Sequence, residues 1–221
     1  ADCAEIMRLA AAATGASAFR FRDRTCDPFA PLERLSVAEA FDRYAGIDLL
    51  ATLHPDGQPD REALATAARR IGTRVAEDDT WSDLLSRILV ERVEPRLGLG
   101  RPTVLDRYPA VEAALARRTP DDARVAERFE LYACGVELAN GFGELTDAVE
   151  QRRRFIAEMD EKQRVYGERY PLDEDFLEAL PHMPPASGIA LGFDRLVMLA
   201  TGASRIEQVV WRSEERRVGK E

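Results

Sequence analysis

Three carboxylates at a spacing of seven residues are the first chemical feature of this sequence. Glu130, Glu137 and Glu144 lie among apolar residues in the stretch from Phe129 to Leu145. A carboxylate in an apolar strand is costly unless a cation compensates it. If the stretch folds as a hairpin, Glu130 and Glu137 can converge on one hard cation. Mg²⁺ suits such a site because it takes oxygen ligands together with substrate phosphates.

The same stretch allows a second chemistry and a purely structural alternative. Glu144 and Asn140 could bind an ammonium group. Alternatively, the carboxylates lie on edge strands and form salt bridges with neighbouring arginines, and Glu144 caps a helix. The spacing alone does not separate these interpretations.

A glycine-rich run followed by an arginine is the second chemical feature. Gly188 and Gly192 flank a short apolar strand, and Arg195 stands at the start of the helix that follows. Glycines allow a ligand to approach the backbone closely. An arginine at this place can stack on a base or hold a phosphate. The structural alternative is a tightly packed junction between a strand and a helix.

The elements that position these residues follow from capping and periodicity signals. Ser36 and Glu39 form a capping-box pattern, and Gly46 suits the end of that helix. Alternating apolar residues around Gly135 indicate a hairpin. Helices are predicted over about 2–13, 36–46, 60–71, 80–95, 147–167, 173–180 and 194–200, and strands over about 19–22, 103–105, 124–133, 136–138 and 187–191.

Composition limits the class of protein. The chain has 221 residues, 45% of them hydrophobic, and a net charge of −9 from 31 Lys+Arg and 40 Asp+Glu. It can bury a sizeable core, and no run of about 18 apolar residues predicts a membrane span. The acidic balance argues against a general nucleic-acid coat protein. The three cysteines are widely spaced, which argues against a disulfide scaffold and against a cysteine-based metal site. We therefore expect the protein to be located in the reducing cytoplasm.

Taken together and in this order, the two features resemble a known family. The class II aminoacyl-tRNA synthetases have a motif 3 that is similar to GIALGFDRLVMLATGA in this sequence. The strand pair that precedes motif 3 in lysyl-tRNA synthetases resembles ERFELYACGVELANGFGELTDAVEQRRRF. The resemblance is strongest over about 101–210, and it is greatest to the elongation factor P–(R)-β-lysine ligase family. Members of that family are synthetase-like enzymes that lysylate a protein instead of tRNA.

The resemblance implies an α+β fold, with a class II synthetase-like antiparallel sheet flanked by helices. It implies ATP-dependent activation of lysine or β-lysine, with Mg²⁺, and transfer to a lysine of elongation factor P. A piece of a lysyl-tRNA synthetase that charges tRNA-Lys is the alternative enzyme. A non-catalytic synthetase-like binding protein is the alternative from another class. The full-length form is expected to be a homodimer without membrane association.

The resemblance also implies a role for each matching residue at the ATP site. Glu130, with the backbone of Leu131, is expected at that site, and Glu137 is expected to contact substrate or Mg²⁺, which makes Glu130 and Glu137 the metal pair. Gly192 is expected to let ATP lie against the strand. Arg195 is the expected catalytic residue, which stacks on adenine and approaches the γ-phosphate.

Three further residues are expected to bind the amino acid. Asn140 and Glu144 match residues that line the amino-acid pocket, where an anionic side chain suits a lysine ammonium. Ala190 matches a position that is usually glycine in lysyl-tRNA synthetases, whereas the protein-ligase relatives resemble this sequence with alanine. A methyl group there narrows the pocket, disfavours an α-amino group and admits a β-amino acid.

Two departures from the family pattern are visible in the sequence. Motifs 1 and 2 are not found, so residues 1–211 are expected to form an incomplete catalytic domain that begins after motif 2. The stretch Arg212–Glu221 is highly charged and does not match the family. We therefore expect residues 1–221 alone to be inactive.

Overall fold

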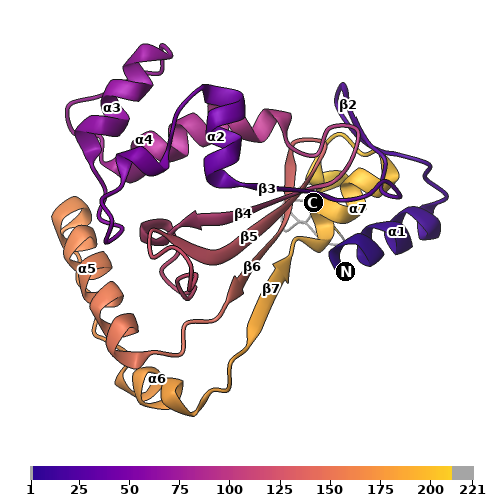
Figure 1. Cartoon of the computed structure of the whole chain (residues 1–221). Coiled ribbons are helices and arrows are strands. Elements are labelled where there is room, and N and C mark those ends of the chain that lie inside the picture. Colours follow the sequence, from indigo (N-terminus) through magenta and orange to yellow (C-terminus); the bar gives the residue numbers. More distant parts are fainter. Residues whose placement is uncertain (1, 211–221) are drawn as a thin grey trace, which may run out of the picture.

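A five-stranded sheet with the strand order β3-β4-β5-β6-β7 carries both motif stretches of the chain. The structure is a computed structural model, and it describes residues 2–210 (Figure 1). The strands of this sheet are β3 (Glu33–Ser36), β4 (Thr103–Pro109), β5 (Val125–Ala133), β6 (Val136–Gly143) and β7 (Ser187–Leu191). A separate antiparallel pair consists of β1 (Phe19–Phe21) and β2 (Arg24–Cys26).

The sheet is antiparallel except at one edge, where β3 pairs with β4 in parallel. This arrangement confirms the predicted α+β class. The strand β3 was not predicted, because its sequence Glu33-Arg34-Leu35-Ser36 has one apolar residue and lies at the edge of the sheet. Its register with β4 places Leu35 beside Leu105, and both are buried.

The hairpin of β5 and β6 is longer than the sequence predicts. Cys134 and Gly135 make the turn with positive φ angles of 56° and 69°. The predicted strand 136–138 extends to Gly143, because β6 pairs with β5 on one side and with β7 on the other. Gly141 is required there, since a Cβ atom would lie 2.6 Å from the Phe129 ring.

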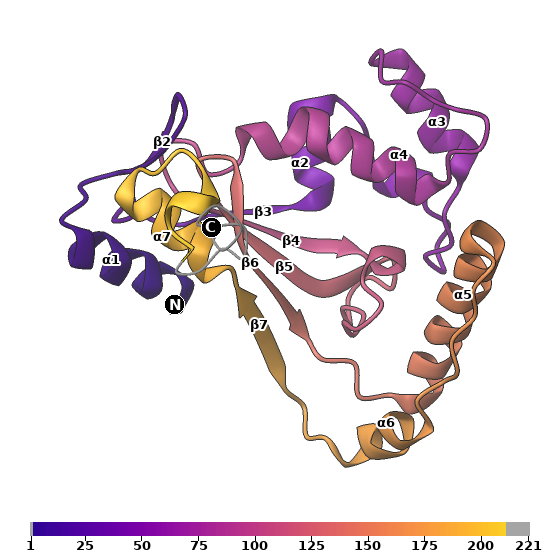
Figure 2. The same ribbon diagram turned by 180° about the vertical axis from the view of Figure 1, so that it is seen from behind.

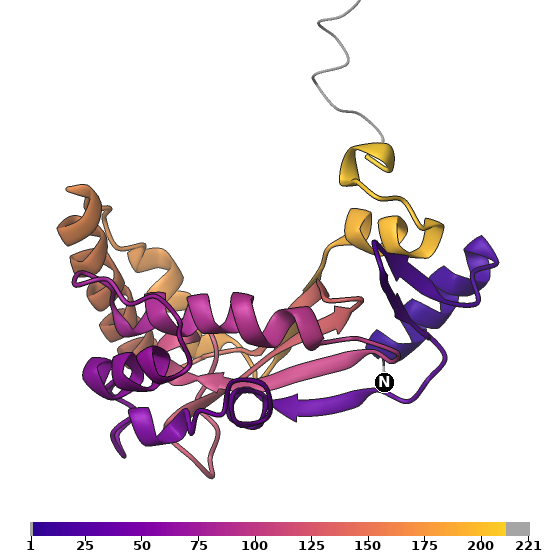
Figure 3. The ribbon, with the colours of Figure 1, turned by 90° about the horizontal axis from the view of Figure 1, so that it is seen from above.

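Seven α-helices surround the sheet within the described residues. They are α1 (Asp2–Thr14), α2 (Val37–Ala45), α3 (Arg61–Arg70), α4 (Trp81–Ile88), α5 (Ala148–Tyr166), α6 (Glu174–Ala179) and α7 (Phe193–Thr201). One core packs α2, α3 and α4 against Leu105 and Tyr132. A second core packs α1 and α7 against Leu131 and Ala139. Figure 2 shows these layers from behind, and Figure 3 shows α1 and α7 together at one end of the sheet with α5 at the other.

The helix predicted over 80–95 is divided into three parts. After α4, a π-helical segment covers Leu89–Val93 and a 3₁₀ turn covers Glu94–Arg96. Pro95 explains the change, because its ring lacks an N–H and clashes with the carbonyl four residues earlier in a regular α-helix. The other predicted helices agree with the structure to within one or two residues. None of the helices over residues 2–210 combines the length and the apolar character that a bilayer span needs, and the charged stretch 212–221 lies outside the described residues.

The capping box at the start of α2 provides a stability test. The Ser36 hydroxyl accepts a hydrogen bond from the Glu39 backbone N–H at 3.2 Å, and the Glu39 carboxylate accepts one from the Ser36 N–H at 2.8 Å. We expect Ser36→Ala to lower the free energy of unfolding by about 1 kcal/mol, and Ser36→Gly by only a few tenths. Urea titration monitored by circular dichroism measures both values. Equal stability of Ser36→Ala and the wild type would show that the cap does not contribute.

Candidate functional site

Three of the predicted site residues lie in one row across the sheet. Glu130 on β5 is the direct partner of Asn140 on β6, and Asn140 is the direct partner of Ala190 on β7. Directly opposed residues in antiparallel strands project from the same face. This face therefore presents a carboxylate, an amide and a methyl group side by side. The side chain of Leu131 projects from the opposite face, so only its backbone is available here.

Glu144 lies over the next row of the sheet, in which Gly188 on β7 opposes Phe142 on β6. Its Oε1 atom is 2.6 Å from the position that a Cβ atom would take at Gly188, so the missing side chain at Gly188 makes room for the carboxylate. No residue over 2–210 donates a side-chain hydrogen bond or ion pair to Glu144. The alternative role of Glu144 as a helix cap is wrong, because Asp147 caps α5 through the backbone N–H groups of Val149 and Glu150.

Glu130 is the most enclosed carboxylate of this face. It is 6% exposed, and its Oε2 atom accepts hydrogen bonds from the hydroxyls of Tyr108 and Tyr132 at 2.5 and 2.6 Å. Its Oε1 atom accepts a hydrogen bond from Arg128 at 2.7 Å. Burial, together with neighbouring acidic groups, raises the pKa of both tyrosines above their ordinary value. The tyrosines therefore stay protonated and act as donors.

Glu137 and Arg195 meet at the end of the same hairpin. Arg195 Nη1 donates to the Glu137 backbone oxygen at 2.9 Å and approaches the Glu137 Oε2 atom at 3.3 Å. Both residues line a cleft of about 400 Å³, whose walls also include Phe21, Glu94, Gly135, Val136, Met198, Ser204, Arg205 and Ile206. Gly192 opens α7 beside this cleft, where a Cβ atom would lie 3.4 Å from Arg195 Cδ.

The prediction that Glu130, Glu137 and Arg195 face one cavity is met only in part. Glu137 and Arg195 line the cleft, whereas Glu130 does not. Tyr132 is the direct partner of Glu137 and donates its hydroxyl proton to Glu130, so the two carboxylates belong to the same face. The salt-bridge alternative also holds for two of the three carboxylates, because Arg128 pairs with Glu130 and Arg195 with Glu137.

Glu94 is a residue of this site that the sequence did not reveal. It follows the π-helical segment, is half-buried and lines the cleft with Glu137 and Arg195. Burial raises the pKa of Glu94, and the charges of Glu130 and Glu137 raise it further. In the sequence, Glu94 is one acidic residue in a charged helical stretch. Its place in the site depends on the helix break before Pro95.

The carboxylates do not form a ready-made metal cage. Over residues 2–210, no three His, Cys, Asp or Glu side chains are arranged to hold one metal ion. Mg²⁺ nevertheless needs only one or two carboxylates when substrate phosphates complete its ligands. Glu137 keeps its Oε1 atom without a hydrogen bond from the described residues, and Glu130 Oε1 accepts only one. The donor set therefore fits an ion that arrives with phosphates.

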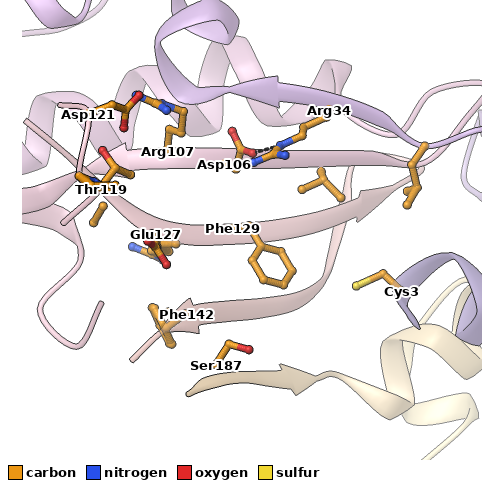
Figure 4. A pocket seen from close by; sticks show the side chains of 16 residues that line it. Cys3, Arg34, Asp106, Arg107, Thr119, Asp121, Glu127, Phe129, Phe142 and Ser187 are labelled. Atoms are coloured by element: carbon orange, nitrogen blue, oxygen red, sulfur yellow. Dashed lines mark hydrogen bonds and ion pairs between the residues drawn. The ribbon is translucent and has the colours of Figure 1, made fainter. Parts of the chain in front are cut away.

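A cavity larger than this cleft lies elsewhere, on the face from which Phe129 projects (Figure 4). Its volume is about 640 Å³, and none of the predicted site residues lines it. Its charged residues form pairs, among them Arg34 with Asp106 and Arg107 with Asp121. The predicted site residues Glu130, Asn140 and Ala190 project from the opposite face of the sheet.

Comparison with known proteins identifies the family of this chain. The family model for tRNA synthetases class II (D, K and N) matches residues 2–213. The chain belongs to this family. Class II membership accounts for the antiparallel sheet whose last strand, β7, leads through Gly192 into a helix that begins with Phe193, Asp194 and Arg195.

Individual relatives in this class II family have two kinds of name. The chain is 47% identical over 183 residues to an elongation factor P–(R)-β-lysine ligase from Proteus mirabilis, and 42% identical over 181 residues to one from Haemophilus influenzae. These matches cover 80% and 81% of the chain but 54% of each relative, so the chain spans about half of their length. A lysine–tRNA ligase from Dehalococcoides mccartyi is 40% identical over 192 residues, which are 86% of the chain and 37% of that relative.

The pKa of Glu94 predicts a pH-dependent effect on stability. The folded state disfavours the ionised Glu94 carboxylate, so at pH values above the ordinary pKa of 4.5 this group lowers the free energy of unfolding. At lower pH the carboxyl group is protonated in both the folded and the unfolded state, and it no longer lowers the stability. We expect Glu94→Gln to raise the melting temperature at pH 7.5, with a gain that vanishes below about pH 4.5. Scanning calorimetry across this range tests it, with Glu77→Gln at an exposed position as the control. A gain that persists at pH 4 would contradict the electrostatic cause.

Proposed function

We propose that the intact protein activates a lysine-type amino acid with ATP and transfers it to a lysine of elongation factor P. The observation that carries this proposal is the row of Glu130, Asn140 and Ala190, with Glu144 beside it over Gly188. It supports an amino-acid pocket in which the Glu144 carboxylate, which has no cation partner among residues 2–210, lies on the same face of the sheet as the Asn140 amide. We infer elongation factor P as the acceptor from the names of the relatives from Proteus mirabilis and Haemophilus influenzae.

The proposed reaction has two steps. The carboxylate oxygen of the amino acid attacks the α-phosphorus of ATP, an acyl–phosphate bond forms, and pyrophosphate leaves with the electrons of the broken bond. The amine of the acceptor lysine then attacks the carbonyl carbon, an amide forms, and AMP leaves. Little covalent work falls to the protein, because positioning and charge compensation lower the barrier.

At the amino-acid end, Glu144 and Asn140 orient the substrate. The Glu144 carboxylate accepts the side-chain ammonium, and Gly188 keeps the space for it. The Asn140 side chain faces the same space, and Ala190 Cβ lies beside it on β7. Orientation of the reacting carboxylate is the main contribution of these residues.

At the nucleotide end, Arg195 and the glutamates bind ATP. Arg195 is half-exposed beside Glu137, so its guanidinium can stack on the adenine and approach the γ-phosphate. The backbone of Leu131 and the small Gly192 allow the nucleotide to lie against the sheet. Glu137 and Glu130 would hold Mg²⁺, which offsets phosphate charge when it is bound. The homodimer and the cytoplasmic location remain predictions.

A lysine–tRNA ligase is the second candidate, because the relative from Dehalococcoides mccartyi matches 86% of the chain. The two candidates share the activation step and differ in the acceptor. The test incubates the intact protein with ATP, labelled lysine or β-lysine, and either elongation factor P or tRNA-Lys. Label in elongation factor P supports the proposal, and label in tRNA-Lys supports the second candidate. Absence of ATP–pyrophosphate exchange with every lysine isomer would refute both.

Ala190 provides the specificity test. Its methyl group stands beside Asn140 on the proposed pocket floor. We expect Ala190→Gly in the intact protein to improve activation of α-lysine relative to β-lysine by roughly ten-fold, since one methyl group supplies about 1–3 kcal/mol of discrimination. ATP–pyrophosphate exchange with each isomer measures the ratio. An unchanged ratio in a folded, active variant would remove Ala190 as the selector.

A further inference from the structure

Arg154 on α5 binds the backbone of a segment that lies beside the end of β6. Its Nη1 atom donates hydrogen bonds to the carbonyl oxygens of Ala113 and Ala116, both at 2.7 Å. Its Nε atom donates to Glu150 Oε1 on the same helix at 2.9 Å. The Arg154 side chain is 10% exposed, so these hydrogen bonds are largely shielded from water. Arg154 therefore fastens residues 113–117, the clamped segment, to α5.

The clamped segment pairs with the backbone of Glu144. Ala116 is the direct antiparallel partner of Glu144. Two flanking backbone hydrogen bonds, of 2.8 and 2.9 Å, join residues 115–117 to residues 143–145. On its other side, the Glu144 N–H donates to the Ala186 oxygen at 3.0 Å. Glu144 is therefore held between the clamped segment and the chain that leads into β7.

Stability alone does not explain why a charged side chain is buried at this place. The Nη2 atom of Arg154 is buried and donates to no atom of residues 2–210. An unused donor on a buried guanidinium costs free energy, and an apolar replacement of a buried ion pair is often neutral or stabilising. A buried charge that selects one geometry accounts for the contacts of Arg154, because all of them fix the clamped segment or α5.

The position of the Glu144 carboxylate depends on this backbone. No side chain over residues 2–210 donates to the carboxylate, and its Oε1 atom occupies the space that the missing side chain of Gly188 leaves. A side chain without a partner follows its own backbone. A displaced clamped segment would therefore move the carboxylate relative to the rest of the amino-acid pocket.

We propose that Arg154 is a positioning residue that fixes Glu144 through Ala116 and thereby sets the length of the side chain that the pocket accepts. This inference rests on the proposed function, because it concerns the amino-acid end of the same pocket. A carboxylate on a fixed backbone meets an ammonium group at one distance. On a loosened backbone it can follow a side chain that is one methylene shorter. No contact with the substrate is assigned to Arg154.

The first test measures the backbone and does not require activity. Hydrogen exchange of the intact protein compares the wild type with Arg154→Met at the two flanking amides, those of Arg117 and Leu145. We expect exchange to be at least about ten-fold faster in the variant, because local opening controls exchange and the clamp is lost. The Gly192 amide, which is hydrogen-bonded at the other end of β6, should exchange as in the wild type. Equal exchange at Arg117 and Leu145 in both proteins would overturn the proposal.

The second test measures the accepted length. ATP–pyrophosphate exchange of the intact protein compares the lysine isomer that the wild type prefers with its ornithine counterpart, which is one methylene shorter. We expect Arg154→Met to lower the ratio of kcat/KM for lysine to that for ornithine by at least about ten-fold, since one methylene gives roughly 10–200-fold discrimination. The KM for ATP should not change, because the clamped segment lies at the amino-acid end.

Arg153→Met is the matched control. Arg153 precedes Arg154 on α5 and pairs with Glu150 at 2.8 Å, but it is 58% exposed and donates no hydrogen bond to the clamped segment. Its removal should leave hydrogen exchange and the lysine-to-ornithine ratio as in the wild type. If Arg154→Met does not fold, Arg154→Lys takes its place, because an ammonium group lacks the fork that reaches Glu150 and two carbonyls at once. The ratio should then fall by at least about three-fold.

The outcomes separate this proposal from the proposed function. A lysine-to-ornithine ratio that is equal in Arg154→Met and the wild type would overturn the role of Arg154, even if hydrogen exchange is faster. A rise in the KM for ATP as large as that for lysine would also overturn it, since it would indicate a general loss of structure. Failure of the wild type to activate any lysine isomer would refute the proposed function, and hydrogen exchange would still decide whether Arg154 fixes the backbone of Glu144.

Discussion

The buried carboxylate of Glu130 is the constraint on which much of this structure depends. A carboxylate that is 6% exposed must be compensated, and three side chains share that task. Arg128 comes from the same strand, Tyr132 lies two residues further along it, and Tyr108 comes from the end of β4. The two tyrosines also belong to the core that packs α2, α3 and α4. Compensation of one charge therefore ties the site to the helical layer.

The register of three strands distributes the functional groups. Because β6 has a partner on each side, the residues of β5 and β7 that oppose Asn140 must project from the same face. A slip of one residue would turn Glu130 and Ala190 to the other face. The close contact of Gly141 with Phe129 and of Gly188 with Glu144 opposes such a slip, because any larger residue would collide there.

The two faces of the sheet have different tasks. Val104, Leu131 and Ala139 alternate with the site residues and pack toward α1 and α7. The same alternation explains why the cavity of about 640 Å³, lined by Phe129 and paired charges, contains no residue of the predicted site. The polar face has smaller openings but concentrates acidic groups, and the raised pKa of Glu94 results from that concentration together with burial.

The sequence by itself determined the family, the α+β class and the positions of most helices, because caps such as Ser36 and Asp147 and the glycines after helices act over a few residues. Through two motifs that are each contiguous in the chain, it also named Glu130, Asn140 and Ala190 as candidate site residues, whereas their alignment in one row follows from the strand register. Only the tertiary structure decided which carboxylates have cation partners, that Glu94 joins Glu137 at the cleft, and that β3 completes the sheet. These features depend on contacts between segments that are distant in the chain, such as Arg195 with Glu137 and Tyr108 with Glu130. Local propensity and spacing carry no information about such contacts, because the energy of a pair is set by burial and distance after the chain has folded.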